Sequence, residues 1–176
     1  MNVFVAGVHG VGKTYMCQRA GTSLGLTHAS SSKLIREQLA LPVWNANKLV
    51  SDIEGNQRAL IAAIERYADE KKDILLDGHF LLRDETGKLT EIPSGVFASL
   101  NLAGVVLLEK DVEVIRRQVA DRDGHEPEAE PLLEAIQAEK HRAQEVCSQL
   151  ALPLAILNDP GEKEFAEVVS GLFRRR

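Results

Sequence analysis

Gly7-Val8-His9-Gly10-Val11-Gly12-Lys13-Thr14 follows the pattern G-x-x-x-x-G-K-[ST]. Residues 2–6, just before it, form a short apolar run of strand type. Residues 14–24, just after it, have helical composition and end at Gly25, which suits a helix C-cap. Strand, glycine-rich loop and helix are the context in which this pattern marks a phosphate-binding loop. The stretch therefore predicts a P-loop nucleotide-binding domain.

Each residue type in this loop has a chemical reason to be there. Glycine lets the backbone curl so that successive N–H groups point toward phosphate oxygens at the positive end of the following helix. Lys13 would supply a cation to the β- and γ-phosphates, and the Thr14 hydroxyl would bind Mg²⁺. We therefore predict ATP and Mg²⁺ as cofactors. The residues expected to hold the nucleotide are Lys13 and Thr14 with His9, Gly10, Val11, Gly12 and Tyr15.

The composition is that of an ordinary globular protein, with 44% apolar and 27% charged residues in a chain of 176. The net charge of −5 argues against a nucleic-acid partner, because no broad basic face is expected to attract phosphates. The basic cluster Arg174-Arg175-Arg176 is more typical of a solvated tail. No apolar run approaches the roughly 18 residues of a membrane-spanning helix, so we expect no membrane partner.

Cysteine usage points to a reducing compartment. Cys17 and Cys147 lie far apart in the sequence, and neither belongs to a C-x-x-C pair. Both fall on apolar positions of expected helices, which predicts buried free thiols. With no signal peptide expected before the first strand, we predict a cytoplasmic protein.

Apolar runs of strand type alternate with amphipathic stretches of helix type along the chain. Strands are expected at residues 2–6, 26–29, 73–77, 102–109 and 153–157. Helices are expected at 14–24, 33–41, 52–68, 111–121, 130–150 (with Leu133 facing the core) and 164–174. A turn signal at 84–88 predicts a small hairpin, and Pro93 opens a short helix. This alternation predicts an α/β fold, a three-layer α/β/α sandwich around a five-stranded parallel sheet.

Ligands of parallel sheets bind beyond the carboxyl ends of the strands. Asp77 ends an apolar strand, as a Walker-B-type carboxylate does, and we expect it to organise Mg²⁺ together with Thr14. The alternative is an ordinary strand-end acid that faces solvent. The segments expected at this edge are the P-loop, Ser30-Ser31-Ser32, Asp77-Gly78-His79, Glu109-Lys110-Asp111 and Asn158-Asp159.

Three arginines are candidates for the positive charge that phosphoryl transfer requires. Arg116 flanks the apolar face of the helix at 111–121, and Arg122 begins the polar loop beyond that helix. Arg142 flanks the apolar face of the next helix. We predict that these three form a catalytic phosphate clamp, although each could instead be a surface arginine. The sequence leaves open whether Arg116 or its neighbour Arg117 faces the cleft.

With these motifs, the chain resembles the nucleoside monophosphate kinases over essentially its whole length, and most closely the compact adenylate kinases of archaeal type. Ser30-Ser31-Ser32-Lys33-Leu34-Ile35-Arg36 resembles the acceptor segment S-T-G-D-x-L-R of that family. By this resemblance Ser31 would lie near the acceptor base and Arg36 would hold the acceptor phosphate. Asp77-Gly78-His79 resembles the archaeal-type pattern, which places Gly78 and His79 at the acceptor. Asn158 falls where family members hold the adenine of ATP.

The resemblance also implies an organisation and a reaction. It implies one P-loop kinase domain over residues 1–176, with acceptor-binding helices at about 30–70 and a short lid at about 121–129. The lid would close to exclude water, so that the acceptor phosphate attacks the γ-phosphate of ATP. The implied reaction is ATP + NMP to ADP + NDP, with a small-molecule nucleotide as partner. The sequence leaves the oligomeric state open between a monomer and a weak dimer.

Two alternatives remain open at this point. The first keeps the fold and phosphoryl transfer but changes the acceptor to a sugar, a shikimate-like acid, a drug or a polynucleotide 5′ end. The second is a nucleotide-binding ATPase or switch without kinase activity. The sequence lacks the guanine-recognition pattern N-K-x-D, which argues against a GTPase. Base specificity is not determined by any of these motifs.

Overall fold

A computed structural model describes residues 1–39, 53–69, 73–83 and 86–174. Its centre is a five-stranded sheet in the order β2-β3-β1-β6-β7. All neighbouring strands in this sheet run parallel, which confirms the predicted fold class. The five strands are β1 (Asn2–Ala6), β2 (Thr27–Ser30), β3 (Ile74–Asp77), β6 (Leu102–Glu109) and β7 (Leu154–Asn158).

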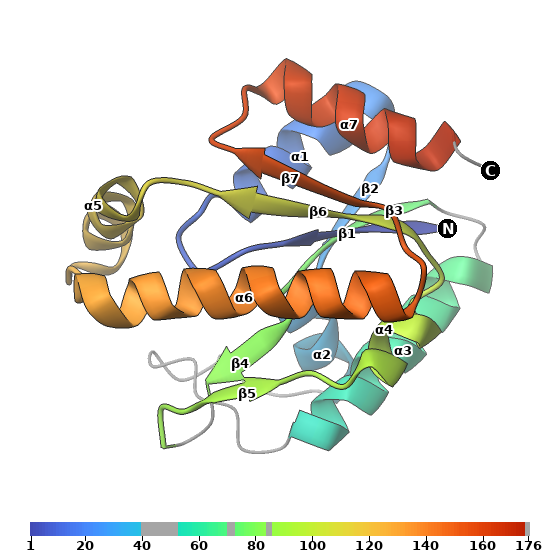
Figure 1. The fold of residues 1–176 in the computed structure, drawn as a ribbon. Helices are drawn as coiled ribbons and strands as arrows, with labels where there is room; N and C mark the ends of the chain where they lie inside the picture. The colour runs from blue at the N-terminus through green and yellow to red at the C-terminus, as the bar shows by residue number, and fades with distance from the viewer. Residues whose placement is uncertain (40–52, 70–72, 84–85, 175–176) are drawn as a thin grey trace.

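Helices cover both faces of the sheet and complete the three layers (Figure 1). α1 (Lys13–Leu24) and α7 (Glu162–Arg174) pack together on one face. α6 (Ala129–Gln149) crosses the other face, and α5 (Val112–Asp123) stands beyond the carboxyl ends of β6 and β7. The remaining helices, on the side of α6, are α2 (Ser31–Leu39), α3 (Ile53–Asp69) and α4 (Ser94–Ser99).

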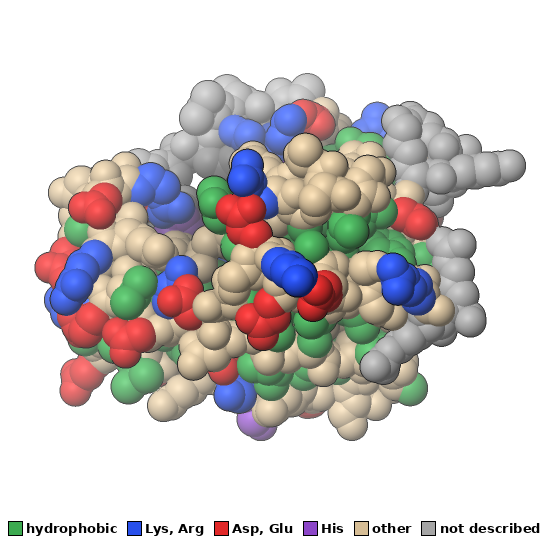
Figure 2. Space-filling model, turned by 90° about the horizontal axis from the view of Figure 1, so that it is seen from above, with side chains coloured by type: hydrophobic (Ala, Val, Ile, Leu, Met, Phe, Trp, Pro, Cys, Tyr) green, Lys and Arg blue, Asp and Glu red, His purple; other side chains and the backbone are tan. Residues whose placement is uncertain are grey.

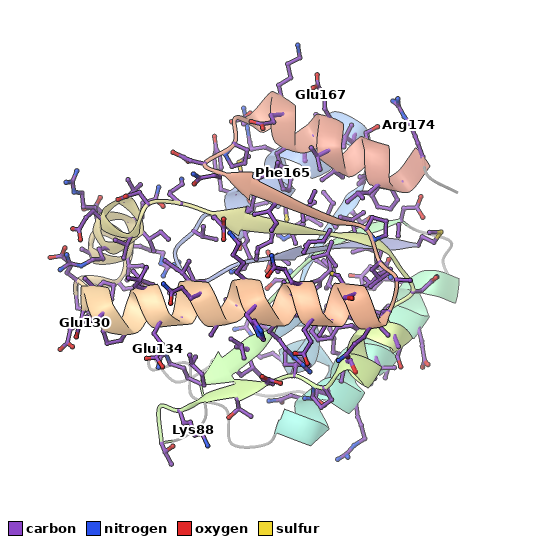
Figure 3. The ribbon with its side chains drawn as sticks, viewed as in Figure 1. Lys88, Glu130, Glu134, Phe165, Glu167 and Arg174 are labelled. Carbon is purple, nitrogen blue, oxygen red and sulfur yellow. The ribbon has the colours of Figure 1, made fainter. Side chains whose placement is uncertain are left out.

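The side chains of β1 alternate between two halves of the core, because successive strand residues point to opposite faces of a sheet. Phe4 packs in the half that contains α3, α4 and α6, whereas Val3 packs in the half that contains α1 and α7. In the first half, the rings of Phe80 and Phe97 stack with their centroids 4.5 Å apart, and Phe4 meets both rings edge-on. In the second half, Phe165 points from α7 toward the sheet and is fully buried (Figure 3).

Between β3 and β6 the chain leaves the main sheet to form the predicted hairpin. β4 (Leu81–Arg83) pairs antiparallel with β5 (Leu89–Glu91) in a separate two-stranded sheet. α4 follows directly after Pro93, as predicted. Because β4 contacts α6, the hairpin lies near the carboxyl edge of the main sheet.

The end of α5 differs from the prediction. The Asp111 side chain accepts from two backbone N–H groups and caps the start of this helix, while Gly124 ends it in a left-handed conformation. The helix therefore runs to Asp123. Arg122, expected to begin a loop, lies in the last helical turn.

One core position of α6 was also predicted wrongly. Leu133 is 46% exposed, and its neighbour Leu132 packs against the core instead. Cys17 and Cys147 are buried and unpaired, as the sequence predicted. The expected end of the second helix at residue 41 lies outside the described residues.

Seen from the side of α7, acidic and basic side chains alternate among apolar ones, and no single charge dominates that face (Figure 2). Within the described residues, no helix combines the length and the apolar character needed to cross a membrane.

Gly104 of β6 provides a test of the packing between the sheet and α7. A Cβ atom at this position would lie 2.8 Å from a methyl group of Leu172 and 3.1 Å from the carbonyl oxygen of Pro153. We expect Gly104→Ala to lower the free energy of unfolding by about 1–3 kcal/mol through overpacking, as measured by urea denaturation. Gly95→Ala in α4 is the control, since a Cβ there meets nothing within 4 Å. Equal stability of the two variants would contradict the prediction.

Candidate functional site

A cleft opens at the carboxyl ends of the parallel strands, where the P-loop joins β1 to α1. Its volume is about 1630 Å³, which exceeds the roughly 300–1,000 Å³ of a pocket for one small ligand. The cleft therefore has room for two ligands. The predicted site residues that line it are His9, Gly10, Val11, Gly12, Lys13, Thr14, Tyr15, Ser31, Arg36, Asp77, Gly78, His79 and Arg122.

The glycines of the P-loop permit its path. Gly12 precedes α1 with φ 101°, and no side chain caps the start of this helix. The first backbone N–H groups of a helix have no partner within the helix, so they are suited to bind an anion. Gly7 passes so close to β6 that a Cβ would lie 2.6 Å from the carbonyl oxygen of Leu108. The sequence pattern and the backbone geometry thus agree on a phosphate-binding loop.

Lys13 lies at the centre of the cleft. Its ammonium group donates to the carbonyl oxygens of Gly7 at 2.7 Å and Val8 at 3.1 Å, and it lies 3.5 Å from Nε2 of His79. The side chain is only 8% exposed. Burial lowers the pKa of Lys13 from 10.5 to about 8, although the charges of Glu139 and Asp77 act in the opposite direction. The ammonium group is therefore desolvated and ready to pair with an anionic ligand.

Thr14 and Asp77 meet as the sequence predicted. The Thr14 hydroxyl donates to Oδ2 of Asp77 at 3.1 Å, and Nε2 of His28 lies 2.7 Å from the same oxygen. Burial would raise the pKa of Asp77, but His28, Lys13 and Thr14 together hold it below its ordinary value. Asp77 is therefore ionised at neutral pH. A hydroxyl and a carboxylate are oxygen ligands of the kind that Mg²⁺ prefers, so these residues fit the predicted metal.

Glu139 of α6 is the largest departure from the expected site. Its carboxylate is 3% exposed and accepts from the backbone N–H groups of Phe80 at 2.8 Å and Leu81 at 3.0 Å. Burial raises the pKa of Glu139 from 4.5 to about 7. The two hydrogen bonds, a third from the Gly7 N–H and the charge of Lys13 act in the opposite direction. One carboxylate thus ties α6 to the segment after β3 and to the P-loop.

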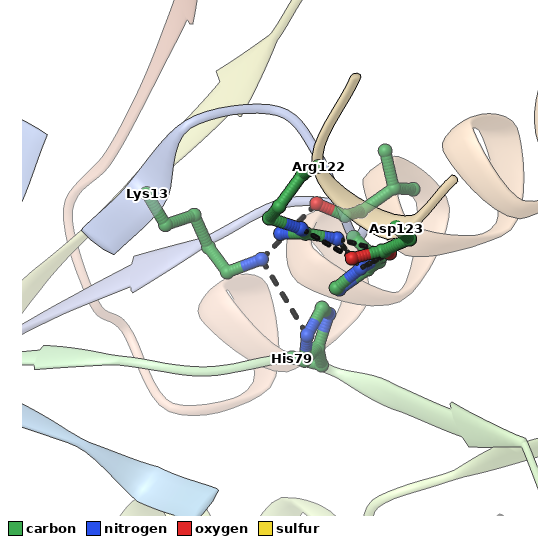
Figure 4. A network of polar contacts seen from close by, with 6 residues as sticks. Lys13, His79, Arg122 and Asp123 are labelled. Atoms are coloured by element: carbon green, nitrogen blue, oxygen red, sulfur yellow. Dashed lines mark hydrogen bonds and ion pairs between the residues drawn. The ribbon is translucent and has the colours of Figure 1, made fainter. Parts of the chain in front are cut away.

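Arg122 reaches the P-loop from the last turn of α5 (Figure 4). Its guanidinium donates to both carboxylate oxygens of Asp123, at 2.7 and 2.6 Å, and also contacts Nε2 of His9. His9 in turn lies 3.2 Å from Asp123. The charge of Arg122 lowers the pKa of Lys13, so the two cations act on the same region of the cleft.

The other two arginines of the predicted clamp do not line the cleft. Arg142 is buried in ion pairs with Glu91 at 3.2 Å and Glu145 at 2.6 Å, and it donates to the carbonyl oxygen of Ile92. These contacts join α6 to the hairpin. Of the three predicted arginines, Arg122 alone lines the cleft in this structure.

Arg116 serves the connection between α5 and α6. It pairs with Glu113 and with Glu126 at 3.3 Å, and it donates to the carbonyl oxygen of Pro127 at 2.9 Å. The exposed Arg117 does not line the cleft either. The segment expected as a lid at about 121–129 is short, because its first residues belong to α5 and its last begins α6. Arg116 holds the remaining residues, 124–128, against α5.

The two ends of the cleft have different linings. At the nucleotide end, Asn158 completes β7 without lining the cleft, and the residues that follow it, from Asp159 to Glu162, line the cleft instead. The Tyr15 side chain is 55% exposed and its hydroxyl donates to Glu162. At the end of the cleft near α2, the Ser31 hydroxyl donates to the carbonyl oxygen of Asp77 at 2.8 Å.

Sequence reasoning missed His28 and Glu139. His28 lies in a short strand whose register places it beside Leu75, next to the strand that ends at Asp77, and no local pattern marks it. Glu139 did leave a signal. It falls on the stripe of α6 that includes Ala143 and Val146, where an acid needs a buried partner.

The model of one protein family, described as an AAA domain, matches residues 6–136. This span begins at the end of β1, contains the P-loop, Asp77 and Arg122, and ends within α6. No protein of curated function is significantly similar to the chain in sequence.

Solved structures share the fold over nearly the whole chain. A gluconokinase from Sinorhizobium meliloti is 14% identical with a TM-score of 0.55, covering 98% of this chain and 91% of that one. The shikimate kinase from Acinetobacter baumannii in complex with shikimate is 17% identical with a TM-score of 0.56, covering 98% and 92%. A sugar kinase from a Janibacter species is 18% identical with a TM-score of 0.56, covering 98% and 93%. At such identities these likenesses show the fold alone.

Glu139 makes stability depend on pH in a defined direction. Because its pKa in the folded protein, about 7, lies above the ordinary 4.5, the folded state binds the proton more tightly. Stability should therefore fall as pH rises from about 4.5 to about 7, by at most about 3 kcal/mol. We expect urea denaturation at several pH values to show this fall in the wild type and not in Glu139→Gln.

The matched control is Glu134→Gln. Glu134 lies on the same helix, α6, and its exposed side chain points away from the helix (Figure 3). This variant should keep the pH dependence of the wild type. If Glu139→Gln kept it as well, the origin assigned to the pH dependence would be wrong.

Proposed function

The chain belongs to the AAA domain family. We propose that it is an ATP-dependent phosphotransferase whose acceptor is a nucleoside monophosphate. The observation that carries the proposal is the pairing of two features in one cleft. One is the P-loop, with desolvated Lys13 beside the Thr14–Asp77 pair. The other is the part of the same cleft that Ser31 and Arg36 line. Hydrolysis alone would need only the first.

The residues of the P-loop side act on the phosphates of ATP. The N–H groups of the loop and the first turn of α1 would bind phosphate oxygens, and Lys13 would exchange its carbonyl partners for them. Mg²⁺, held by Thr14 and Asp77, would neutralise charge on the β- and γ-phosphates. Arg122 would stabilise the charge of the transferring group, because it shares the region around Lys13.

Arg36 supports an acceptor that carries an anionic group. It lines the cleft from α2, and its buried Nε has no hydrogen-bond partner in the described part of the chain. A phosphate placed there would satisfy this donor and hold the acceptor for in-line attack on the γ-phosphate. A small uncharged acceptor would leave the guanidinium without a partner.

A second candidate acceptor is a small hydroxy acid. Arg116 and Arg142, which a nucleoside monophosphate kinase would be expected to use, are engaged in ion pairs and do not line the cleft. The solved structures with this fold include proteins described as a gluconokinase and a shikimate kinase. The carboxylate of such an acid could occupy the position next to Arg36 in place of a phosphate.

ADP production by the purified protein with MgATP tests the reaction class and the acceptor together. We expect turnover to rise on addition of one nucleoside monophosphate and to stay low with gluconate or shikimate. Lys13→Ala is the inactive control. Turnover that rises only with an acid would favour the second candidate, and turnover that no acceptor stimulates would contradict the kinase proposal.

We expect kcat to depend on Arg122 and not on Arg117, an arginine of the same helix. We expect Arg122→Ala to lower kcat on the order of 10³-fold, as removal of a transition-state arginine does. Arg117→Ala, an exposed arginine on the same helix, is the control and should retain wild-type kcat. A kcat within threefold of wild type for Arg122→Ala would exclude the role assigned to it.

A further inference from the structure

From the polar groups at the acceptor end of the cleft, and resting on the proposed function, we infer that Asn56 and Gln57 are specificity-determining residues that recognise the nucleobase of the acceptor. Both line the cleft from α3, the helix that packs against α2. Neither belongs to the phosphate-binding loop.

Gln57 and Arg36 each present a buried donor that the described residues leave unsatisfied. Nε2 of Gln57 and Nε of Arg36 are buried without a hydrogen-bond partner among the residues that the structure describes. A buried donor without an acceptor costs free energy, so such groups are rare in folded proteins unless a ligand completes them. Both side chains line the same cleft. A ligand that satisfies both donors must carry two hydrogen-bond acceptors, one for Gln57 and one for Arg36.

Asn56 adds a second amide to this end of the cleft. It is only 8% exposed although it is polar, and it directly precedes Gln57 on the first part of α3. An amide side chain offers a donor and an acceptor side by side. Such a pair matches the adjacent donor and acceptor on the edge of a nucleobase, as when Asn or Gln contacts adenine. The anionic end of the ligand would go to Arg36.

The remaining wall of this compartment is apolar. Leu60 lies one helical turn beyond Asn56, and it lines the cleft together with Ile92 and Phe97. A flat aromatic ring can cover such a wall while its edge reaches the amides. A polyol would place hydroxyl groups against carbon atoms, where they would lose hydrogen bonds to water. The lining therefore favours a nucleobase over a sugar.

Equilibrium binding of AMP, GMP, CMP and UMP to the purified protein, measured by calorimetry, tests this inference. In the wild type we expect one monophosphate to bind more tightly than the others. Gln57→Leu and Asn56→Leu should each weaken that monophosphate by about 10- to 100-fold and reduce the preference between bases. Affinity for ATP should stay within about twofold. Gln137→Leu, an exposed amide on α6, is the control and should change neither.

A measurement of stability separates recognition from a structural role. Because Leu removes an unpartnered buried polar group, Gln57→Leu without ligand should unfold at a urea concentration no lower than the wild type. An earlier midpoint together with an unchanged base preference would show that the amide supports the fold and would overturn the inference.

The outcomes for the inference and for the proposed function are distinct. If the wild type binds monophosphates selectively but transfers no phosphoryl group to them, the kinase proposal fails and the recognition site stands. If it phosphorylates a monophosphate but both leucine variants keep its base preference, the recognition site fails and the kinase proposal stands. No selective binding by the wild type would also overturn the inference.

Discussion

The buried carboxylate of Glu139 is the contact on which the geometry of the cleft depends. It accepts from the backbone of Phe80 and Leu81 after β3, and it faces the desolvated ammonium group of Lys13. The segment that follows β3 and the P-loop that follows β1 are thereby both held to α6. Without an acceptor there, their N–H groups would be buried and unsatisfied, which proteins avoid. Because Glu139 also accepts from the Gly7 N–H, one residue holds both the P-loop and the segment after β3.

The strand order explains why the other functional groups meet. β1 lies between β3 and β6, and Val5 pairs in register with Asp77. The P-loop leaves β1 at the same level at which β3 ends, so Thr14 and Asp77 come within hydrogen-bonding distance. Open parallel sheets bind ligands where the connections from neighbouring strands diverge. The meeting of Thr14 and Asp77 is thus a consequence of topology.

The features that sequence predicted well are local ones. The P-loop, the five strands and the excursion between β3 and β6 leave patterns of glycine, apolar runs and turn residues within a few positions of each other. The roles of the arginines depend on partners distant in sequence. Arg142 pairs with Glu91, and Arg116 holds residues 126 and 127, so helical phase alone could not distinguish them from Arg122. His28 was missed for the same reason.

Glu139 and Arg142 stand three residues apart on α6, and each anchors a different wall of the cleft. Along a helix that separation is a rise of about 4.5 Å. α6 therefore fixes the distance between the segment that follows β3 and the end of the hairpin. A shift or tilt of α6 would therefore displace both walls of the cleft together.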